Sequence, residues 1–365
     1  MTMSSLKPVA TVGSSKYGNR SKIPDQLLSS FHISDSSKAI LAEAGEFSLA
    51  RSTWSTYNTA AKLQKECEKQ LGRNLVYPWS EADTLEFIGW LLSVRKVKSS
   101  TVSSYLAGIK QLHVLQGVEP PQLKSTLVKF LLRGQKNKDN IEARKSQKRL
   151  PITINMMKLL KGAVKQWEAE RVDKLLWWSV CTMAFHGGFR IHEILCRTET
   201  EFDPDFTLLA EDVWLTENKD EHRTEKILMV KLKCPKEDRA GKAVIVELHE
   251  TRGTLCPKKA FEKWRKKGIW ETGMPLLRKN DGTPLTGSKL NVWLKDRLGK
   301  FVQSTSGKFT YHSFRIGLAS TMAASGLDET DIKEAGRWSS MAYETYMKLP
   351  QARRANAARL ISKLE

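Results

Sequence analysis

Residues 175–195 read LLWWSVCTMAFHGGFRIHEIL. The first part of this stretch is nearly all apolar, so a helix formed by it must be buried on most of its sides. Gly187 and Gly188 then end that helix. Directly after them, Arg190 and Glu193 stand three positions apart, on one face of a new helix, where the carboxylate can hold the guanidinium in a fixed orientation. The buried helix places this pair at the edge of a core, which favours a functional site over a surface ion pair.

The residues around this stretch indicate a domain that covers 151–365. A helix is expected over Met156 to Trp167, before the apolar helix, and helices return toward the C-terminus. Between them lie three strand-like runs, of which the last two are separated by the polar sequence CPKEDRAG and predict a hairpin. The runs are DVWLT (212–216), KILMVKLK (226–233) and KAVIVEL (242–248). The fold class predicted is therefore mainly α with a small antiparallel β-sheet.

The N-terminal part predicts a second, helical domain over residues 46–135. Its first helix begins near Ser52 and Thr53, and others follow Ser80 and the Ser99–Ser100 pair. A fourth helix is expected at roughly Leu123 to Leu132, and the four together can close one small core. Residues 1–45 are rich in serine and poor in large apolar side chains, so we expect a flexible tail.

The charge balance makes a polyanion the expected partner. The chain has 60 Lys and Arg against 40 Asp and Glu, which gives a net charge of +20. Its five cysteines are odd in number and include no CxxC pair, which argues against a disulfide framework and a zinc site. The sequence contains no long apolar run and no signal-peptide core, so we expect neither membrane insertion nor secretion.

A basic linker is expected at residues 136–150, because this stretch has almost no apolar side chains. The residues alone support two interpretations equally, contact with a phosphate backbone and a solvated hinge that contacts nothing. Together with three cations of the helical domain, the linker cations are our candidate DNA contacts. These candidates are Lys62, Lys98, Lys110, Lys136, Lys138, Arg144, Lys145, Lys148 and Arg149.

Two further motifs lie near the C-terminus. The sequence YHSFRIGLAS (311–320) sets His312 and Arg315 one helical turn apart, and Trp338 follows in GRWSSMAYETY. Ser339 or Ser340 can cap a helix on which Tyr343 and Tyr346 are neighbours on one face. The geometry of that helix does not choose between the two tyrosines.

This ordered set of motifs resembles the catalytic domain of the tyrosine recombinases. The sequences HSFRIGLAS, GRWSS and AYETY are most similar to those of recombinases of eukaryotic mobile elements of the Crypton and DIRS type. The resemblance covers roughly residues 48–350, and it implies that residues 46–135 are the core-binding domain of that family. It also implies cleavage and rejoining of DNA strands through a 3′-phosphotyrosyl intermediate.

The resemblance assigns a role to each motif. Arg190 and Arg315 would clamp the phosphate, whose developing charge suits bidentate guanidiniums, and Glu193 would steady Arg190. His312 would accept the proton of the attacking phenol. Trp338 would pack against the site and donate its indole N–H toward the phosphate or the tyrosine.

A lysine of the hairpin would protonate the leaving 5′-hydroxyl. Lys236 is preferred, because PKEDRAGK is similar to the mobile-element pattern, and Lys233 is held in reserve. The pattern of that branch selects Tyr346 as the nucleophile over Tyr343. In bacterial and phage relatives the tyrosine typically comes one residue later, where this chain has Met347.

No cofactor is expected, since the sequence has no phosphate-binding GxxxxGK[ST] loop, no HExxH and no tight acidic cluster. The resemblance implies double-stranded DNA as the partner, with a homodimer on one site and a homotetramer in the synaptic complex. Exchange of the C-terminal helix with a neighbour is implied as well, although the residues alone equally allow it to dock on its own domain. In a eukaryote the protein would act in the nucleus, and otherwise in the cytoplasm. The alternative hypothesis is a domesticated DNA-binding protein of the same fold that no longer cleaves DNA.

Overall fold

The computed structural model of the chain describes residues 32–49, 51–119, 125–143, 148–219, 224–233, 243–302 and 307–338. The chain forms two compact units, Met1–Ser146 and Gln147–Glu365. The described residues are mainly helical with a small three-stranded antiparallel sheet, as the sequence predicted. Among them, no helix has the length and apolar character needed to cross a membrane.

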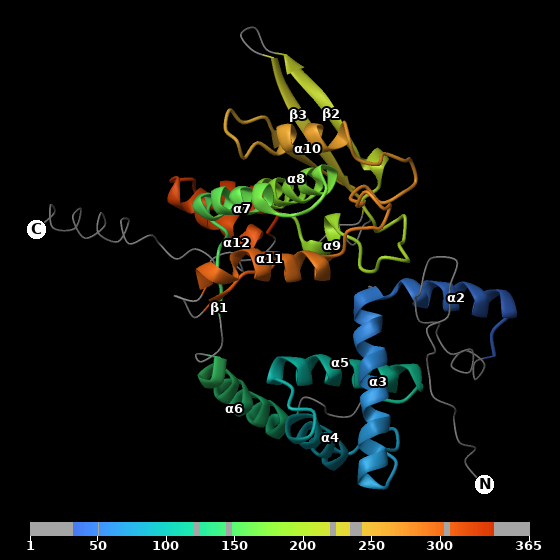
Figure 1. The fold of residues 1–365 in the computed structure, drawn as a ribbon. Coiled ribbons are helices and arrows are strands. Elements are labelled where there is room, and N and C mark those ends of the chain that lie inside the picture. Colours follow the sequence, from blue (N-terminus) through green and yellow to red (C-terminus); the bar gives the residue numbers. More distant parts are fainter. Residues whose placement is uncertain are drawn as a thin grey trace, which may run out of the picture. The chain divides into compact units, whose positions relative to one another are not determined.

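The first unit is helical throughout its described part (Figure 1). Its helices are α2 (Asp35–Phe47), α3 (Arg51–Leu71), α4 (Glu81–Ser93), α5 (Ser99–Leu115) and α6 (Thr126–Ala143). The core contains a stripe of α3 side chains spaced by three and four residues, Ala60, Leu63 and Cys67, which pack with buried residues of α4 and α5. Ser80 caps α4 as expected, in a reciprocal capping box with Asp83.

Two expectations for this unit are wrong in part. Residues 35–45, expected in the flexible tail, belong to α2, whose first turn is capped by the Ser34 side chain. Residues 136–143, expected in the linker, are the end of α6. A tertiary contact holds this extension, because the Asp139 carboxylate of α6 accepts a hydrogen bond of 2.7 Å from the backbone N–H of Ser99 at the start of α5.

The second unit is built around the apolar helix. Its helices are α7 (Ile154–Gln166), α8 (Arg171–Gly187), α9 (Ile191–Ile194), the 3-10 turn η1 (Ala210–Asp212), α10 (Pro257–Arg265), α11 (Gly287–Val302), α12 (His312–Ala324) and α13 (Glu329–Gly336). Residues 176–185 of α8 are buried without exception, as the sequence predicted. Helices α7, α10 and α12 all pack on α8, which is therefore the centre of this unit.

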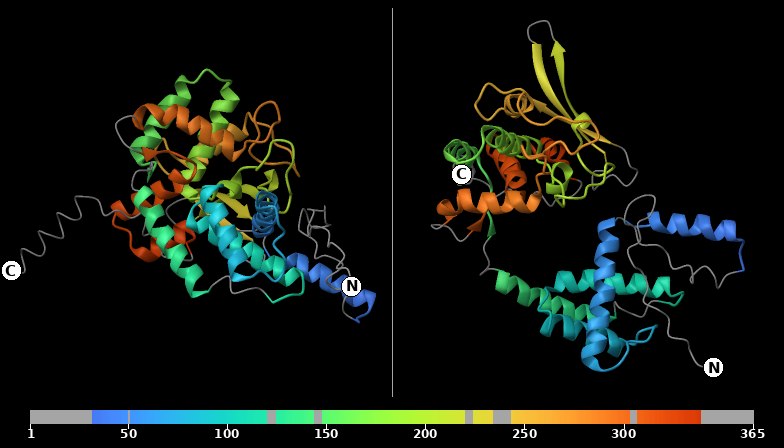
Figure 2. Two further views of the ribbon diagram at one scale, coloured as in Figure 1. Left: turned by 90° about the horizontal axis from the view of Figure 1, so that it is seen from below. Right: turned by 45° about the vertical axis from the view of Figure 1, so that its right-hand side comes forward.

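The strands form two sheets. The antiparallel sheet has the order β2 (Val213–Lys219), β3 (Thr224–Leu232) and β4 (Val244–His249). The predicted hairpin is thus confirmed as the β3–β4 pair. A parallel pair, which the sequence did not predict, joins β1 (Lys148–Arg149) to β5 (Gly307–Lys308). In Figures 1 and 2 the antiparallel sheet lies at one end of the second unit and α11 at the other, with α8 between them.

Helix α12 docks against the segment between β1 and α7. Ile152 donates its N–H to the carbonyl of Ser313 over 2.9 Å. Gly317 lies one turn further along α12, where an added Cβ would come within 1.9 Å of the Ile152 carbonyl oxygen. Only glycine permits this approach of two backbones, and it fixes the position of the helix that carries His312 and Arg315.

Gly317→Ala should therefore lower the free energy of unfolding by about 1–3 kcal/mol, because neither backbone can yield cheaply. Gly162→Ala is the matched control, since a Cβ at that position of α7 meets no atom within 4 Å. It should raise stability by roughly 0.5–1 kcal/mol through helix propensity alone. Urea unfolding of both variants measures the difference, and equal effects of the two substitutions would contradict the proposed close contact.

Candidate active site

The C-terminus of α8 forms the base of the site. Gly188 adopts the left-handed conformation that ends the helix, with φ 52° and ψ 31°. Its carbonyl oxygen accepts a hydrogen bond from Nη1 of Arg315, which reaches it from α12. Phe189 is fully buried after the turn, and the chain then enters α9 at Arg190. The glycine pair thus ends the helix as predicted and also presents a carbonyl to the site.

Arg190 and Glu193 interact as the sequence predicted, but in a different local geometry. Glu193 Oε1 accepts a 2.9 Å hydrogen bond from Arg190 Nη1, and Oε2 accepts one of 2.8 Å from the Arg190 backbone N–H. Arg190 precedes the four-residue helix α9 instead of lying within it. Its side chain is 23% exposed and that of Glu193 is 8% exposed. The largely buried carboxylate therefore fixes a guanidinium that remains accessible.

Arg315 is buried within α12, with only 2% of its surface exposed. Besides the Gly188 carbonyl, it approaches the Arg337 carbonyl, at 3.5 Å from Nη2. Its guanidinium carbon lies 4.4 Å from the ring centroid of Trp338, a cation–π geometry. Trp338 also packs against Ala319, Ala323 and other apolar residues of α12 and α13. The structure therefore brings Arg315 and Trp338 together.

His312 begins α12 and lies among arginines. Burial and, to a lesser extent, the positive charges of Arg149, Arg315 and Arg190 together lower the pKa of its imidazole to about 4. The imidazole is therefore neutral near pH 7, the form that can accept a proton. Arg149 is an exposed residue of β1 that the sequence assigned to the linker, so this linker cation lies close enough to influence the site.

Sequence reasoning missed Arg337, which is central to the polar network. It lies at the end of α13 in the left-handed conformation, with φ 52° and ψ 52°. Its Nη2 donates to Glu193 Oε2 over 2.9 Å and its Nη1 to the Gly187 carbonyl over 3.0 Å. A non-glycine residue pays roughly 1–2 kcal/mol for this backbone conformation. The one available signal was a charged residue between Gly336 and Trp338, and no periodicity identifies its partner.

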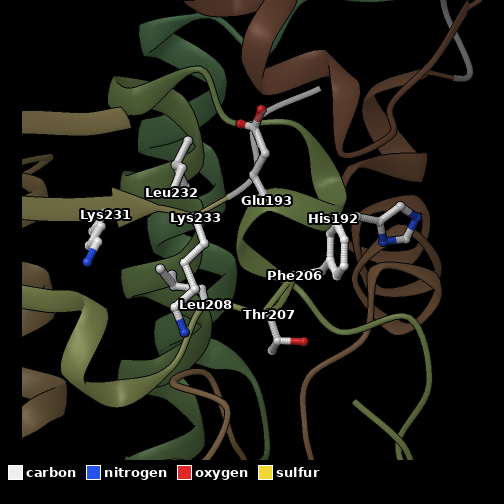
Figure 3. A pocket seen from close by; sticks show the side chains of 8 residues that line it. All are labelled: His192, Glu193, Phe206, Thr207, Leu208, Lys231, Leu232 and Lys233. Carbon is white, nitrogen blue, oxygen red and sulfur yellow. The ribbon is translucent and has the colours of Figure 1, made fainter. Parts of the chain in front are cut away.

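Lys233, the reserve candidate for the general acid, is held away from this network. Its ammonium forms a 2.8 Å ion pair with the buried Asp212 carboxylate and donates to the Pro204 carbonyl over 2.9 Å. Lys233 and Glu193 line the same small pocket, but the ammonium and the carboxylate point toward opposite ends of it (Figure 3). Lys231, two positions earlier on β3, is exposed and lines the same pocket. The lysines of the hairpin that the structure describes therefore lie in a different environment from Arg190 and Arg315.

Several predicted residues lie outside the described part of the chain: Lys236, Tyr343, Tyr346, Arg144 and Lys145. The described candidate DNA contacts of the first unit are exposed. Lys62 lies on α3, Lys98 directly precedes α5, Lys110 lies on α5, and Lys136 and Lys138 lie on α6. Lys148 forms β1 together with Arg149. Within the described residues, no cluster of three or more His, Cys, Asp or Glu could hold a metal ion.

The charge of Arg149 gives a test of the geometry at His312. Arg149→Gln should raise the pKa of the imidazole above about 4, because a nearby cation is removed. Lys308→Gln is the matched control. Lys308 pairs with Arg149 in the β1–β5 register, but it does not contribute to the lowered pKa of His312. An NMR titration of the imidazole, assigned with His312→Gln, measures the pKa. An unchanged value in Arg149→Gln would place Arg149 away from the site.

The low pKa of His312 also affects stability. The unfolded imidazole titrates near 6.5 and the folded one at about 4, so the unfolded state binds more protons between these pH values. Stability should therefore fall as the pH is lowered through this window. His312→Gln should reduce that loss, and urea midpoints at pH 7 and pH 5 measure it.

No protein-family model matches the chain, and no curated protein matches it. Solved structures do match. A XerH site-specific recombinase bound to a palindromic difH substrate, in a post-cleavage complex, has a TM-score of 0.56 and 14% identity, and the match covers 90% of this chain and 85% of that one. A Tn1549 transposon integrase in complex with transposon right-end DNA has a TM-score of 0.52 and 14% identity, with 92% and 98% covered. The chain thus has the fold of the tyrosine recombinases.

Proposed function

We propose that the protein is a site-specific DNA recombinase that cleaves and rejoins DNA strands through a 3′-phosphotyrosyl intermediate. The observation that carries the proposal is the gathering of Arg190, His312 and Arg315 at the end of α8. His312 is influenced by both arginines, and Arg315 lies against Trp338. The similarity of fold to a recombinase in a post-cleavage complex with DNA supports it.

The proposed chemistry balances without further reagents. The phenol oxygen of Tyr346 forms a bond to phosphorus, the bond from phosphorus to the 5′-oxygen breaks, and the strand stays attached through its 3′-phosphate. His312 takes the phenol proton, whose pKa is ordinarily about 10. Lys236 gives a proton to the leaving 5′-oxygen. Arg190 and Arg315 stabilise the charge that develops on the non-bridging oxygens.

The phosphotyrosyl bond conserves the energy of the phosphodiester, so the proposed reaction needs neither ATP nor a metal ion. Attack of the free 5′-hydroxyl on this bond reverses the step and restores the enzyme. Trp338 would contribute its indole N–H to the phosphate or the tyrosine, in addition to stacking on Arg315.

We propose double-stranded DNA as the partner, because the chain has a net charge of +20 and exposes the candidate phosphate contacts whose burial the structure describes. The similarity to a transposon integrase in complex with transposon-end DNA supports a role in mobilising or integrating a transposable element. The motif sequences HSFRIGLAS, GRWSS and AYETY support an element of the Crypton or DIRS type, which would place the protein in a nucleus. A homodimer on one site and a homotetramer in the synaptic complex belong to the same proposal.

The alternative is a DNA-binding protein of this fold that has lost cleavage. A neutral imidazole among arginines adds no charge to phosphate binding, but it can accept a proton, which cleavage requires and binding alone does not. That observation favours the enzyme.

Covalent trapping on DNA tests the proposal. Incubation with nicked DNA from the element's ends should yield a protein–DNA adduct that denaturing gels resolve, because the freed end of a nicked strand diffuses away and prevents religation. Tyr346→Phe should abolish the adduct, and Tyr343→Phe, its neighbour one turn earlier, is the matched control that should retain it. The reverse pattern would assign the nucleophile to Tyr343. Specific DNA binding without any adduct would favour the inactive alternative.

The choice of lysine has its own test. Lys236→Ala should lose at least about 100-fold in cleavage rate, the range typical of a lost general acid. A substrate with sulfur in place of the bridging 5′-oxygen should restore the rate, because a thiolate leaves without a proton. Lys233→Ala is the control. Since Lys233 is paired with Asp212, its loss should lower thermal stability and leave the ratio of the two substrate rates unchanged. Sulfur rescue of Lys233→Ala alone would exchange the two assignments.

A further inference from the structure

Arg337 is linked to both Arg190 and Arg315. Its guanidinium donates to Glu193 Oε2 over 2.9 Å, and the other oxygen of the same carboxylate accepts from Arg190. Its own carbonyl oxygen lies 3.5 Å from Nη2 of Arg315. One residue is therefore connected to Arg190 through Glu193 and to Arg315 through its backbone.

The surroundings of Arg337 hold its side chain in one place. Nη1 donates to the Gly187 carbonyl over 3.0 Å, and the guanidinium lies 5.2 Å from the ring centroid of the buried Phe189. Only 16% of the side chain is exposed. A planar guanidinium can serve a carboxylate and a carbonyl at once, which the single ammonium of a lysine cannot do with the same geometry.

The backbone at this position adds an independent argument. Arg337 and Lys96 are the two non-glycine residues with positive φ among the described residues. Glycine would adopt this conformation without steric strain, so an arginine here retains a side chain at an energetic cost. Lys96 lies exposed at a turn, whereas Arg337 uses its side chain in a buried network. The contrast indicates a specific role for the arginine.

We propose that Arg337 is a positioning residue that sets the orientation of both phosphate-clamping arginines, an inference that rests on the proposed recombinase function. Arg337 restrains one carboxylate oxygen of Glu193, which leaves the other to fix Arg190. Its carbonyl limits how Arg315 can rotate between Gly188 and Trp338. Arg337 touches no reacting atom, and it acts through the two guanidiniums that do.

Removal of the Arg337 side chain would leave Glu193 Oε2 with the Arg190 backbone N–H, but without a guanidinium. The carboxylate could then pair with the Arg190 guanidinium through both oxygens, in the fork geometry that arginine and carboxylate prefer. That pairing draws the guanidinium away from the phosphate position. A displacement of about 1 Å at such a group can cost on the order of 100-fold in rate.

Arg337→Gly is the decisive variant, because glycine relieves the backbone strain while it deletes the side chain. Single-turnover adduct formation should slow by about 10- to 100-fold. On DNA with a methylphosphonate at the scissile position, the rate of Arg337→Gly should be reduced by a smaller factor relative to the wild-type protein. A methyl group in place of a non-bridging oxygen removes the charge that the arginines stabilise. An unaltered rate on normal DNA, or an equal loss on both substrates, would overturn the proposal.

Two further variants separate positioning from folding. Lys96→Gly is the matched control, since it relieves the same strain at a turn outside the network and should leave both rates unchanged. Arg337→Lys retains the charge near Glu193 and should show an intermediate loss of adduct-formation rate. This loss should again be smaller on methylphosphonate DNA. This lysine variant decides the matter if thermal unfolding shows that Arg337→Gly does not fold.

A second readout does not depend on cleavage. Arg190 and Arg315 both depress the pKa of His312, so withdrawal of Arg190 in Arg337→Gly should raise that pKa above about 4 in an NMR titration. If the wild-type protein forms no adduct, the recombinase proposal fails, and the titration still tests the positioning. An unchanged His312 pKa in a folded Arg337→Gly variant would show that Arg337 does not orient the arginines.

Discussion

The last carbonyl groups of α8 are the point on which the site depends. The carbonyls at a helix C-terminus have no partners within the helix, and this end carries partial negative charge. Here the Gly187 carbonyl accepts from Arg337 and the Gly188 carbonyl accepts from Arg315. The apolar body of α8 must be buried, so its end must be buried too, and the two cations satisfy groups that would otherwise lack partners. The burial of α8 therefore also determines where Arg315 and Arg337 lie.

The same arrangement concentrates positive charge around His312. Glu193 neutralises part of it through Arg190 and Arg337. Burial of the imidazole and the charges of three nearby arginines together still lower its pKa to about 4. Such an imidazole is a weak base. On the proposed function, a DNA phosphate bound between the arginines would offset their charge and raise the pKa toward its ordinary value. The basicity of His312 would then depend on the presence of substrate.

Sequence patterns predicted the elements with strong local signals. The apolar run and its two glycines gave α8 and its end, and alternation with a polar turn gave the β3–β4 hairpin. Properties that arise from tertiary contacts escaped prediction. Residues 136–143 read as linker because nothing in their composition reveals that Asp139 would accept from Ser99. Arg337 escaped because its carboxylate partner lies far away in the sequence.

The linker shows why composition left two interpretations of its cations open. Its last residues form β1, in which Arg149 pairs with Lys308 of β5, four positions before His312. The parallel register therefore fixes a cation beside the imidazole. Neither of the two interpretations of the linker, a solvated hinge or a general phosphate contact, requires this placement. Because the two compact units meet in sequence at Ser146 and Gln147, the segment that joins them enters directly into the strand that influences His312. On the proposed function, a DNA contact by Arg149 would draw its charge toward a phosphate and away from the histidine, so backbone contact and proton transfer would be coupled through one side chain.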